Sequence, residues 1–120
     1  MVSRQVDLTS DFNTNNVSKV QIDISGWDYV LAHIIGPSAT ISFNATNDGH
    51  ESTGGYLGDA SSAQNWASVQ GTNQSTGTAT TSSNSNNAIY KFSSVGKFLQ
   101  LTAAAGTTVT KLLVQFAKIQ

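Results

Sequence analysis

Short alternations of apolar and polar residues, each ended by turn residues, constrain the fold of this 120-residue chain more than any other feature. The clearest one is VSKVQIDI at residues 17–24, which places three aliphatic side chains on one face and three polar side chains on the other. A period of two residues is typical of a strand that buries one face. Ser25-Gly26 then ends the run.

Similar runs recur about every ten residues, so we expect about seven to nine short strands. DYVLAHII at 28–35 is apolar on both faces and predicts a central strand, and TISFNATNDG at 40–49 predicts a strand that enters a hairpin turn. The segments at 88–93, 97–103 and 108–119 predict three further strands in a meander. The expected core residues are Ile22, Ile24, Ile41, Phe43, Leu99, Leu101, Val114 and Phe116.

The polar run at 72–87 has two interpretations. Its alternating threonines at 76–80 favour a Thr-rich edge strand, because Thr suits strands and neutral hydroxyls can face water. The alternative is a flexible low-complexity linker.

The strand pattern predicts an all-β fold, namely one antiparallel β-sandwich or jelly-roll-like domain over residues 1–120. A small closed barrel is the alternative architecture. Residues 1–16 lack a comparable pattern and are a candidate extended N-terminal arm. No segment has the apolar period of an amphipathic helix.

The composition excludes several classes of partner. Charged residues make up 11% of the chain and the formal net charge is -1, so neither nucleic acid nor an anionic membrane is an expected partner. There is no cysteine, which excludes disulfides and thiolate metal sites. No stretch approaches the roughly 18 apolar residues that span a bilayer.

Residues that could support catalysis are few. NDGHE at 47–51 combines carboxylates with an imidazole, but its first three residues are sufficiently explained as a turn. His33 lies inside an apolar strand, where a hydrogen-bonded structural histidine is expected. The chain has no nucleophile elbow, phosphate-binding loop or dinucleotide motif. We therefore expect no enzymatic activity, no cofactor and no metal.

Four aromatic residues raise the question of carbohydrate binding. Trp27, Tyr29, Tyr56 and Trp66 could form a platform on which sugars stack. The competing interpretation, which we favour, is that most of them fill the core or close its ends.

Two segments carry apolar side chains that should be shielded from water by other residues or by a partner protein. Tyr56 and Leu57 are the only large apolar residues in a Gly- and Ser-rich stretch at 50–64, which predicts a long loop. In the last strand, Leu113, Ala117 and Ile119 lie on the face opposite the core. This strand should either be central and covered on both sides or form an edge that meets another subunit. These five residues are the candidate interface.

Several of these segments together resemble a pattern in small β-sandwich proteins of tailed-bacteriophage virions. The resemblance rests on TISFNATNDG, NWASVQG at 65–71, AIYKF at 88–92, GKFLQLT at 96–102 and a closing strand rich in Thr and Val. It covers residues 28–119. The chain departs from the pattern where residues 56–64 separate the turn from the tryptophan, and where Gln100 replaces a frequent arginine.

The resemblance implies a capsid decoration protein that is made in the host cytoplasm and binds the outside of the phage head. It further implies a homotrimer at local threefold positions, with itself and the major capsid protein as partners. A tail or baseplate component of similar fold, with tail proteins as partners, is the first alternative. A carbohydrate-binding adhesin module is the second.

Overall fold

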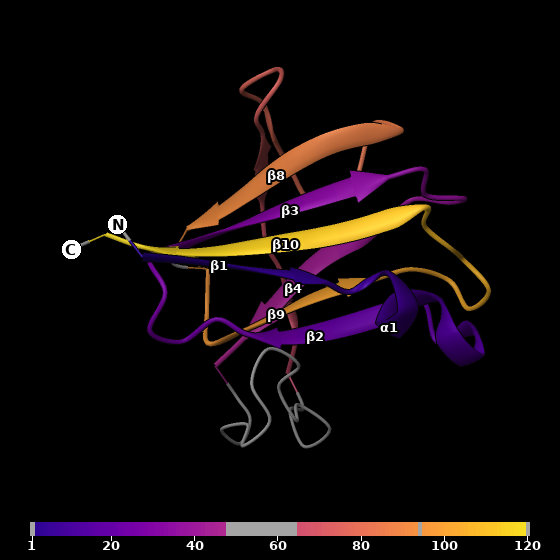
Figure 1. Cartoon of the computed structure of the whole chain (residues 1–120), viewed down its shortest axis with the longest axis horizontal. Helices are drawn as coiled ribbons and strands as arrows, with labels where there is room; N and C mark the ends of the chain where they lie inside the picture. The colour runs from indigo at the N-terminus through magenta and orange to yellow at the C-terminus, as the bar shows by residue number, and fades with distance from the viewer. Residues whose placement is uncertain (1, 48–64, 94, 120) are drawn as a thin grey trace.

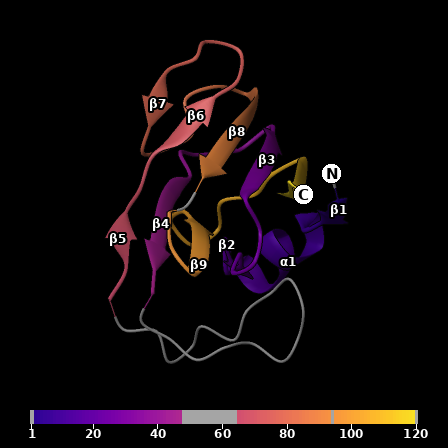
Figure 2. The same ribbon diagram turned by 90° about the vertical axis from the view of Figure 1, so that its left-hand side faces the viewer.

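Two antiparallel β-sheets pack face to face in the computed structural model, which describes residues 2–47, 65–93 and 95–119 (Figures 1 and 2). The six-stranded sheet has the order β1 (Val2–Asp7), β10 (Lys111–Lys118), β3 (Tyr29–Ile35), β8 (Asn87–Ser93), β6 (Gly71–Asn73) and β7 (Ala79–Thr80). The four-stranded sheet has the order β2 (Lys19–Asp23), β9 (Phe98–Thr102), β4 (Ser42–Thr46) and β5 (Ala67–Ser68). The predicted all-β sandwich is confirmed.

The core lies between the two sheets and follows the predicted alternation. All eight expected core residues are buried, with Ile24 the most exposed of them at 6%. In β3 the even-numbered residues point into the core and the odd-numbered ones are half-buried, which fits its place between β10 and β8. Strand phase could therefore be predicted from the sequence.

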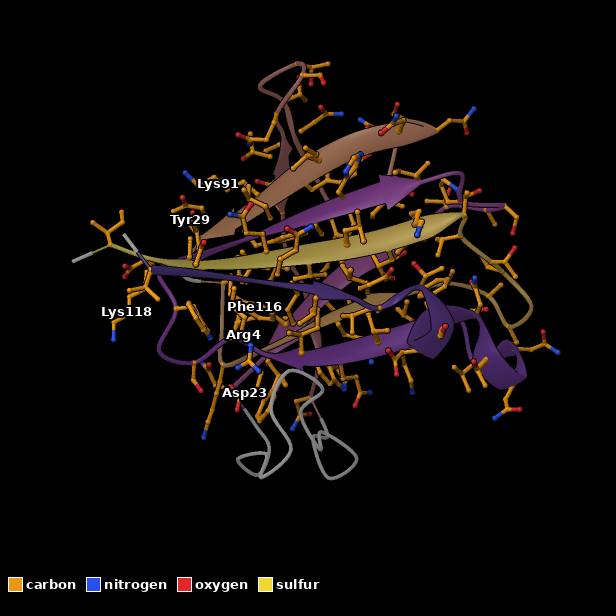
Figure 3. The ribbon with its side chains drawn as sticks, viewed as in Figure 1. Arg4, Asp23, Tyr29, Lys91, Phe116 and Lys118 are labelled. Carbon is orange, nitrogen blue, oxygen red and sulfur yellow. The ribbon has the colours of Figure 1, made fainter. Side chains whose placement is uncertain are left out.

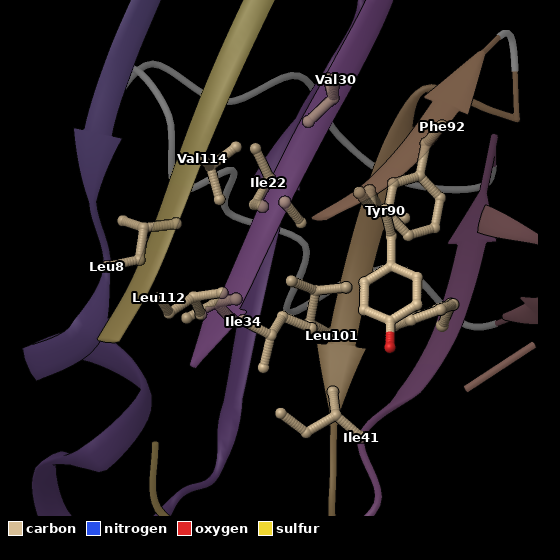
Figure 4. Close-up of a cluster of buried hydrophobic side chains, with 14 of the residues drawn as sticks. Leu8, Ile22, Val30, Ile34, Ile41, Tyr90, Phe92, Leu101, Leu112 and Val114 are labelled. Carbon is tan, nitrogen blue, oxygen red and sulfur yellow. The ribbon is translucent and has the colours of Figure 1, made fainter. Parts of the chain in front are cut away.

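Three aromatic rings from both sheets form the centre of one half of the core. The Phe43 ring lies 5.1 Å from that of Tyr90 and 5.0 Å from that of Phe92, the latter edge to face. Tyr90 and Phe92 follow each other on the inner face of β8 (Figure 4). The Tyr90 hydroxyl donates to Asn84 Oδ1 at 3.0 Å and accepts from the Asn84 amide at 2.9 Å, which satisfies this buried polar group.

The N-terminal segment is part of the sandwich and not an extended arm. Its first residues form β1, and the chain continues into the short helix α1 (Thr9–Asn13) and the 3-10 turn η1 (Thr14–Asn16). Val6, Leu8 and Phe12 are buried and join the core cluster. Only three apolar residues anchor this segment, which is why its sequence pattern is weak.

The last three long strands do not form the predicted meander. β8 and β10 both pair with β3, whereas β9 lies in the other sheet between β2 and β4. The chain thus crosses between the layers at each connection. Turn residues mark where a strand ends, but they do not determine whether the next strand pairs with it or joins the opposite sheet.

The Thr-rich run contributes a shorter edge strand than expected. β7 contains two residues and pairs with β6 at the edge of the six-stranded sheet. Gln74 to Thr76 form the turn between them, followed by Gly77 at a φ of +74°. The edge position is confirmed, and the strand itself is confined to 79–80.

Candidate functional site

The face of the six-stranded sheet that points away from the core is the best candidate for an interaction surface. We call it the outer face and define it by the outward side chains of the three central strands. They are Tyr29, Leu31, His33 and Ile35 of β3, Lys111, Leu113, Gln115 and Ala117 of β10, and Asn87, Ile89, Lys91 and Ser93 of β8. Apolar and neutral polar groups share it with two lysines, and in the part of the chain described here no second layer covers this sheet face.

The predicted interface residues of the last strand differ in exposure. Leu113 is half-buried, Ala117 is fully buried and Ile119 is 64% exposed just beyond β10. β10 lies between β1 and β3, so the alternative that it forms a sheet edge is wrong. Tyr56 and Leu57 lie outside the described residues, and their role stays a prediction.

A shallow hollow lies near the middle of the outer face. It has a volume of about 110 Å³, and Gln5, Leu31, His33, Ile89 and Leu113 contribute to its lining. Such a volume suits a single protruding side chain of a partner and is small for a separate ligand. The hollow therefore fits a protein contact better than a small-molecule site.

Lysine and tyrosine side chains interact beside this hollow. The Lys91 Nζ atom lies 4.5 Å from the centre of the Tyr29 ring, and Figure 3 shows the two side chains next to each other on neighbouring strands. This cation–π contact covers a face of the ring. Tyr29 therefore does not present that face for sugar stacking.

Neither of the two candidate tryptophans joins Tyr29 in a platform. Trp27 packs against the core, with its ring 5.5 Å from that of Phe116. Trp66 precedes β5 in the opposite sheet, and Tyr56 lies outside the described residues. The favoured interpretation, in which these aromatics close the core, holds for Trp27, while Tyr29 and Trp66 occupy separate parts of the surface.

The histidine and carboxylate candidates that the structure describes are not grouped into a site. His33 Nε2 and Asn87 Oδ1 are 2.7 Å apart, which agrees with a hydrogen-bonded structural histidine. Of the NDGHE motif, only Asn47 lies within the described residues. In residues 2–47, 65–93 and 95–119, no three His, Asp or Glu side chains are grouped so that they could bind a metal ion.

Asp7 has a perturbed titration at the end of β1. Its Oδ1 accepts hydrogen bonds from the Thr9 hydroxyl at 2.6 Å and from the Thr9 amide at 3.0 Å, and its Oδ2 lies 3.7 Å from Lys111 Nζ. The Thr9 bonds, with the Lys111 charge as a smaller contribution, lower the pKa of Asp7 below the ordinary 3.8. The carboxylate is thus ionised at neutral pH.

Gln100 stands where the resembled pattern often has arginine. It is 8% exposed, lies in β9 on the side away from the core, and accepts a hydrogen bond from Asn44 Nδ2 at 3.3 Å. A buried neutral amide in a cross-strand hydrogen bond is not available for an ionic contact. Any contact that depends on arginine at this position is therefore absent here.

One feature of the described surface was not predicted from the sequence, namely the side of β1 that faces away from β10. This strand pairs with β10 on one side, and no other described strand lies on its second side. Only Val6 within it is buried, so the sequence carries almost no strand pattern. The sole signal is Val2-x-x-x-Val6-x-Leu8, in which the apolar residues are two or four positions apart.

Comparison with known proteins identifies a similarity of structure and not of sequence. No family model and no curated protein matches the sequence, and no helix among the described residues reaches the length and apolar character needed to cross a bilayer. The structure is similar to the crystal structure of the SPBc2 prophage-derived protein YomS. The TM-score is 0.58 over 97% of this chain and 93% of that chain, at 15% sequence identity. The two proteins share a fold along almost their whole length.

Proposed function

We propose that this chain is a structural protein of a tailed-bacteriophage virion and that it binds the outer surface of the head as a decoration protein. Two observations of different kind support a phage origin. The sequence pattern over residues 28–119 resembles small virion β-sandwich proteins, and the fold is similar to that of a prophage-derived protein.

The observation that carries the structural role is the outer face. Leu31 and Leu113 are half-buried there without a second layer of described residues above them. Leu31 has Gln115 on one side and Lys91 on the other, and the Lys91 ammonium lies over the Tyr29 ring. Protein interfaces combine an apolar centre, few central charges and hydrogen-bonding neighbours. We infer that this face contacts a virion protein, with the major capsid protein as the partner.

The charge of the chain supports the same role. With seven acidic and six basic residues, the molecule has little net charge to repel neighbouring copies on a crowded particle. Short neutral side chains supply hydrogen bonds without the desolvation cost of charges. Such a surface suits dense packing on a lattice.

The localisation test uses virions of the phage whose genome encodes the chain. Quantitative mass spectrometry should find hundreds of copies for each particle, and gold-labelled antibody should mark the head in electron micrographs. Label at the tail with a few dozen copies or fewer would make the chain a tail component. Absence from purified virions would refute the virion proposal.

The binding face can be tested with undecorated heads. Leu113→Glu should lower the affinity for undecorated heads at least about tenfold relative to wild type, because it adds a charge at the centre of the interface. Ser68→Glu is the matched control, since Ser68 is exposed on the opposite sheet. Equal binding by both variants, with unchanged thermal unfolding, would exclude the outer face.

A further inference from the structure

β1 is a regular strand of six residues, and one of its edges pairs with no other described strand. β1 pairs with β10 over Val2–Asp7 in continuous register, and the Leu8 amide extends the ladder by donating to the Leu112 carbonyl at 2.8 Å. Main-chain groups alternate in direction along a strand, so those of the even-numbered residues point to β10. The amides and carbonyls of Ser3, Gln5 and Asp7 therefore point away from the sheet.

The other three sheet edges are shorter or carry a lysine. β7 and β5 contain two residues each, and β2 pairs regularly with β9 over five residues but begins with Lys19. Proteins also protect edges with proline, lysine, a bulge or an inward-pointing charge. β1 has no proline, lysine or bulge, and Arg4, in phase with the buried Val6, is its one charge on the core side. A long, regular edge that no other described strand pairs with is a template for another strand.

We propose that β1 pairs antiparallel with β1 of a second copy of this chain, about a two-fold axis that passes by Gln5. Ser3, Gln5 and Asp7 are symmetric around Gln5, so one register pairs all three outward residues at once. Gln5 then faces Gln5 of the second copy, and Ser3 faces its Asp7. About six main-chain hydrogen bonds form, and the two six-stranded sheets become one continuous sheet.

The side chains favour a second copy as the occupant. In this register the Ser3 hydroxyl lies opposite the ionised Asp7 carboxylate of the second copy, and this pair occurs twice around the axis. Exposed aliphatic side chains also lie near both ends of the strand. Val2 and Ile119, which are 44% and 64% exposed, lie at one end of the edge, and Val17, 49% exposed, follows α1 beyond the other end.

An antiparallel two-fold pairing brings these two ends together. The exposed aliphatic groups of one copy then lie near the helix end of the other, where contact removes them from water. The symmetry is two-fold, unlike the threefold assembly expected from the resemblance. The dimer depends on the sheet edge alone and does not require that the protein decorate a phage head.

Charged substitutions at position 5 test whether the two-fold axis passes by this residue. Sedimentation velocity of the full wild-type chain should give a dimer, with twice the 12.6 kDa mass of one chain. Gln5→Glu and Gln5→Lys should each weaken the dimer on the order of tenfold, because two like charges meet across the axis. An equimolar mixture of the two variants should restore dimers, since it joins unlike charges.

Two further variants serve as controls. Gln70→Glu and Gln70→Lys introduce the same charges at an exposed glutamine between β5 and β6 and should leave the dimer unchanged. Gln5→Pro removes an outward amide and no bond to β10, so it should give a monomer whose thermal unfolding shows an intact fold.

Each other outcome would overturn the proposal. If the wild-type chain stays monomeric at concentrations up to about 0.5 mM, the proposed dimer does not form with a relevant dissociation constant. A trimer would exclude the two-fold axis, and a dimer that survives Gln5→Pro would place the contact elsewhere. Failure of the mixed variants to associate would exclude the register. None of these results depends on where the protein lies in a virion.

Discussion

The side chain of Asn13 makes two hydrogen bonds with the main chain of Val109, across 96 positions of sequence. Asn13 Nδ2 donates to the Val109 carbonyl at 2.9 Å, and Asn13 Oδ1 accepts from the Val109 amide at 2.9 Å. The pair joins the end of α1 to the segment before β10. The amide side chain thus acts as a short piece of β-ladder between two irregular segments.

Replacing Asn13 with alanine should destabilise the protein by about 1 to 3 kcal/mol, because both partners on Val109 lose their bonds in a partly buried place. Urea unfolding measures the loss. Asn13→Asp keeps the acceptor, but its second carboxylate oxygen faces the Val109 carbonyl oxygen in place of the donor, so it should cost at least as much at neutral pH. An alanine variant as stable as wild type would show that water replaces both bonds.

Phe43→Ala should cost about 3 to 5 kcal/mol in the free energy of unfolding. The ring is fully buried and contacts Tyr90 and Phe92, so its removal leaves a cavity and breaks both aromatic contacts. Phe43→Leu refills part of the space and should lose less than half as much. Equal losses in the two variants would mean that volume has little weight at this position.

Gly36→Ala should destabilise more than Gly26→Ala. Both glycines have positive φ, of +63° and +85°, so both substitutions strain the backbone by about 1 to 2 kcal/mol. A Cβ atom at position 36 would also collide with the Thr110 side chain, whereas position 26 is open. Chemical denaturation of both variants separates the two effects. Equal losses would show that Thr110 moves aside freely.

The Asp7 carboxylate should make stability depend on pH in acid. Its pKa in the folded state is lowered from 3.8, so its stabilising contribution is present above that value and disappears as the pH falls through the lower folded pKa. Thr9→Val should raise the pKa, since the hydroxyl bond is the largest cause of the shift. Carboxyl NMR chemical shifts of both proteins between pH 2 and 5 test this expectation. An unchanged pKa in Thr9→Val would assign the shift to another cause.

The predicted contact by Tyr56 and Leu57 needs its own variant. Deleting residues 54–59 should reduce the occupancy of undecorated heads without lowering the unfolding temperature. Replacing Tyr56 and Leu57 with serine keeps the length of the segment and should have the same effect if their side chains make the contact. A deletion variant that saturates the heads as wild type does would refute the assignment.

The strands with one buried face were predictable because burial imposes a period of two on the side chains. Ile41 and Phe43, for example, follow that period and are fully buried. Pairing was not predictable in the same way. Alternation identifies the face that β8 and β10 bury, but it contains no signal that β3 lies between them.

The candidate site was predictable in part. Leu113 was identified because an apolar residue on the second face of a strand needs a cover. The free edge of β1 was missed since an edge strand at the border of the core buries one residue, Val6, and offers no period to detect. α1, with five residues, is too short for a helical period.

The position of β10 affects how the nascent chain folds on the ribosome. It is the last strand of the described chain to be synthesised, yet it lies between β1 and β3, two of the first to emerge. Until β10 leaves the exit tunnel, β1 has no partner in its sheet, and β3 has one open side. The six-stranded sheet is therefore completed only after β10 has been translated. Until then, the main-chain groups of β1 and β3 that pair with β10 stay unpaired. Slow elongation before residue 111 should then raise the fraction of chains that aggregate.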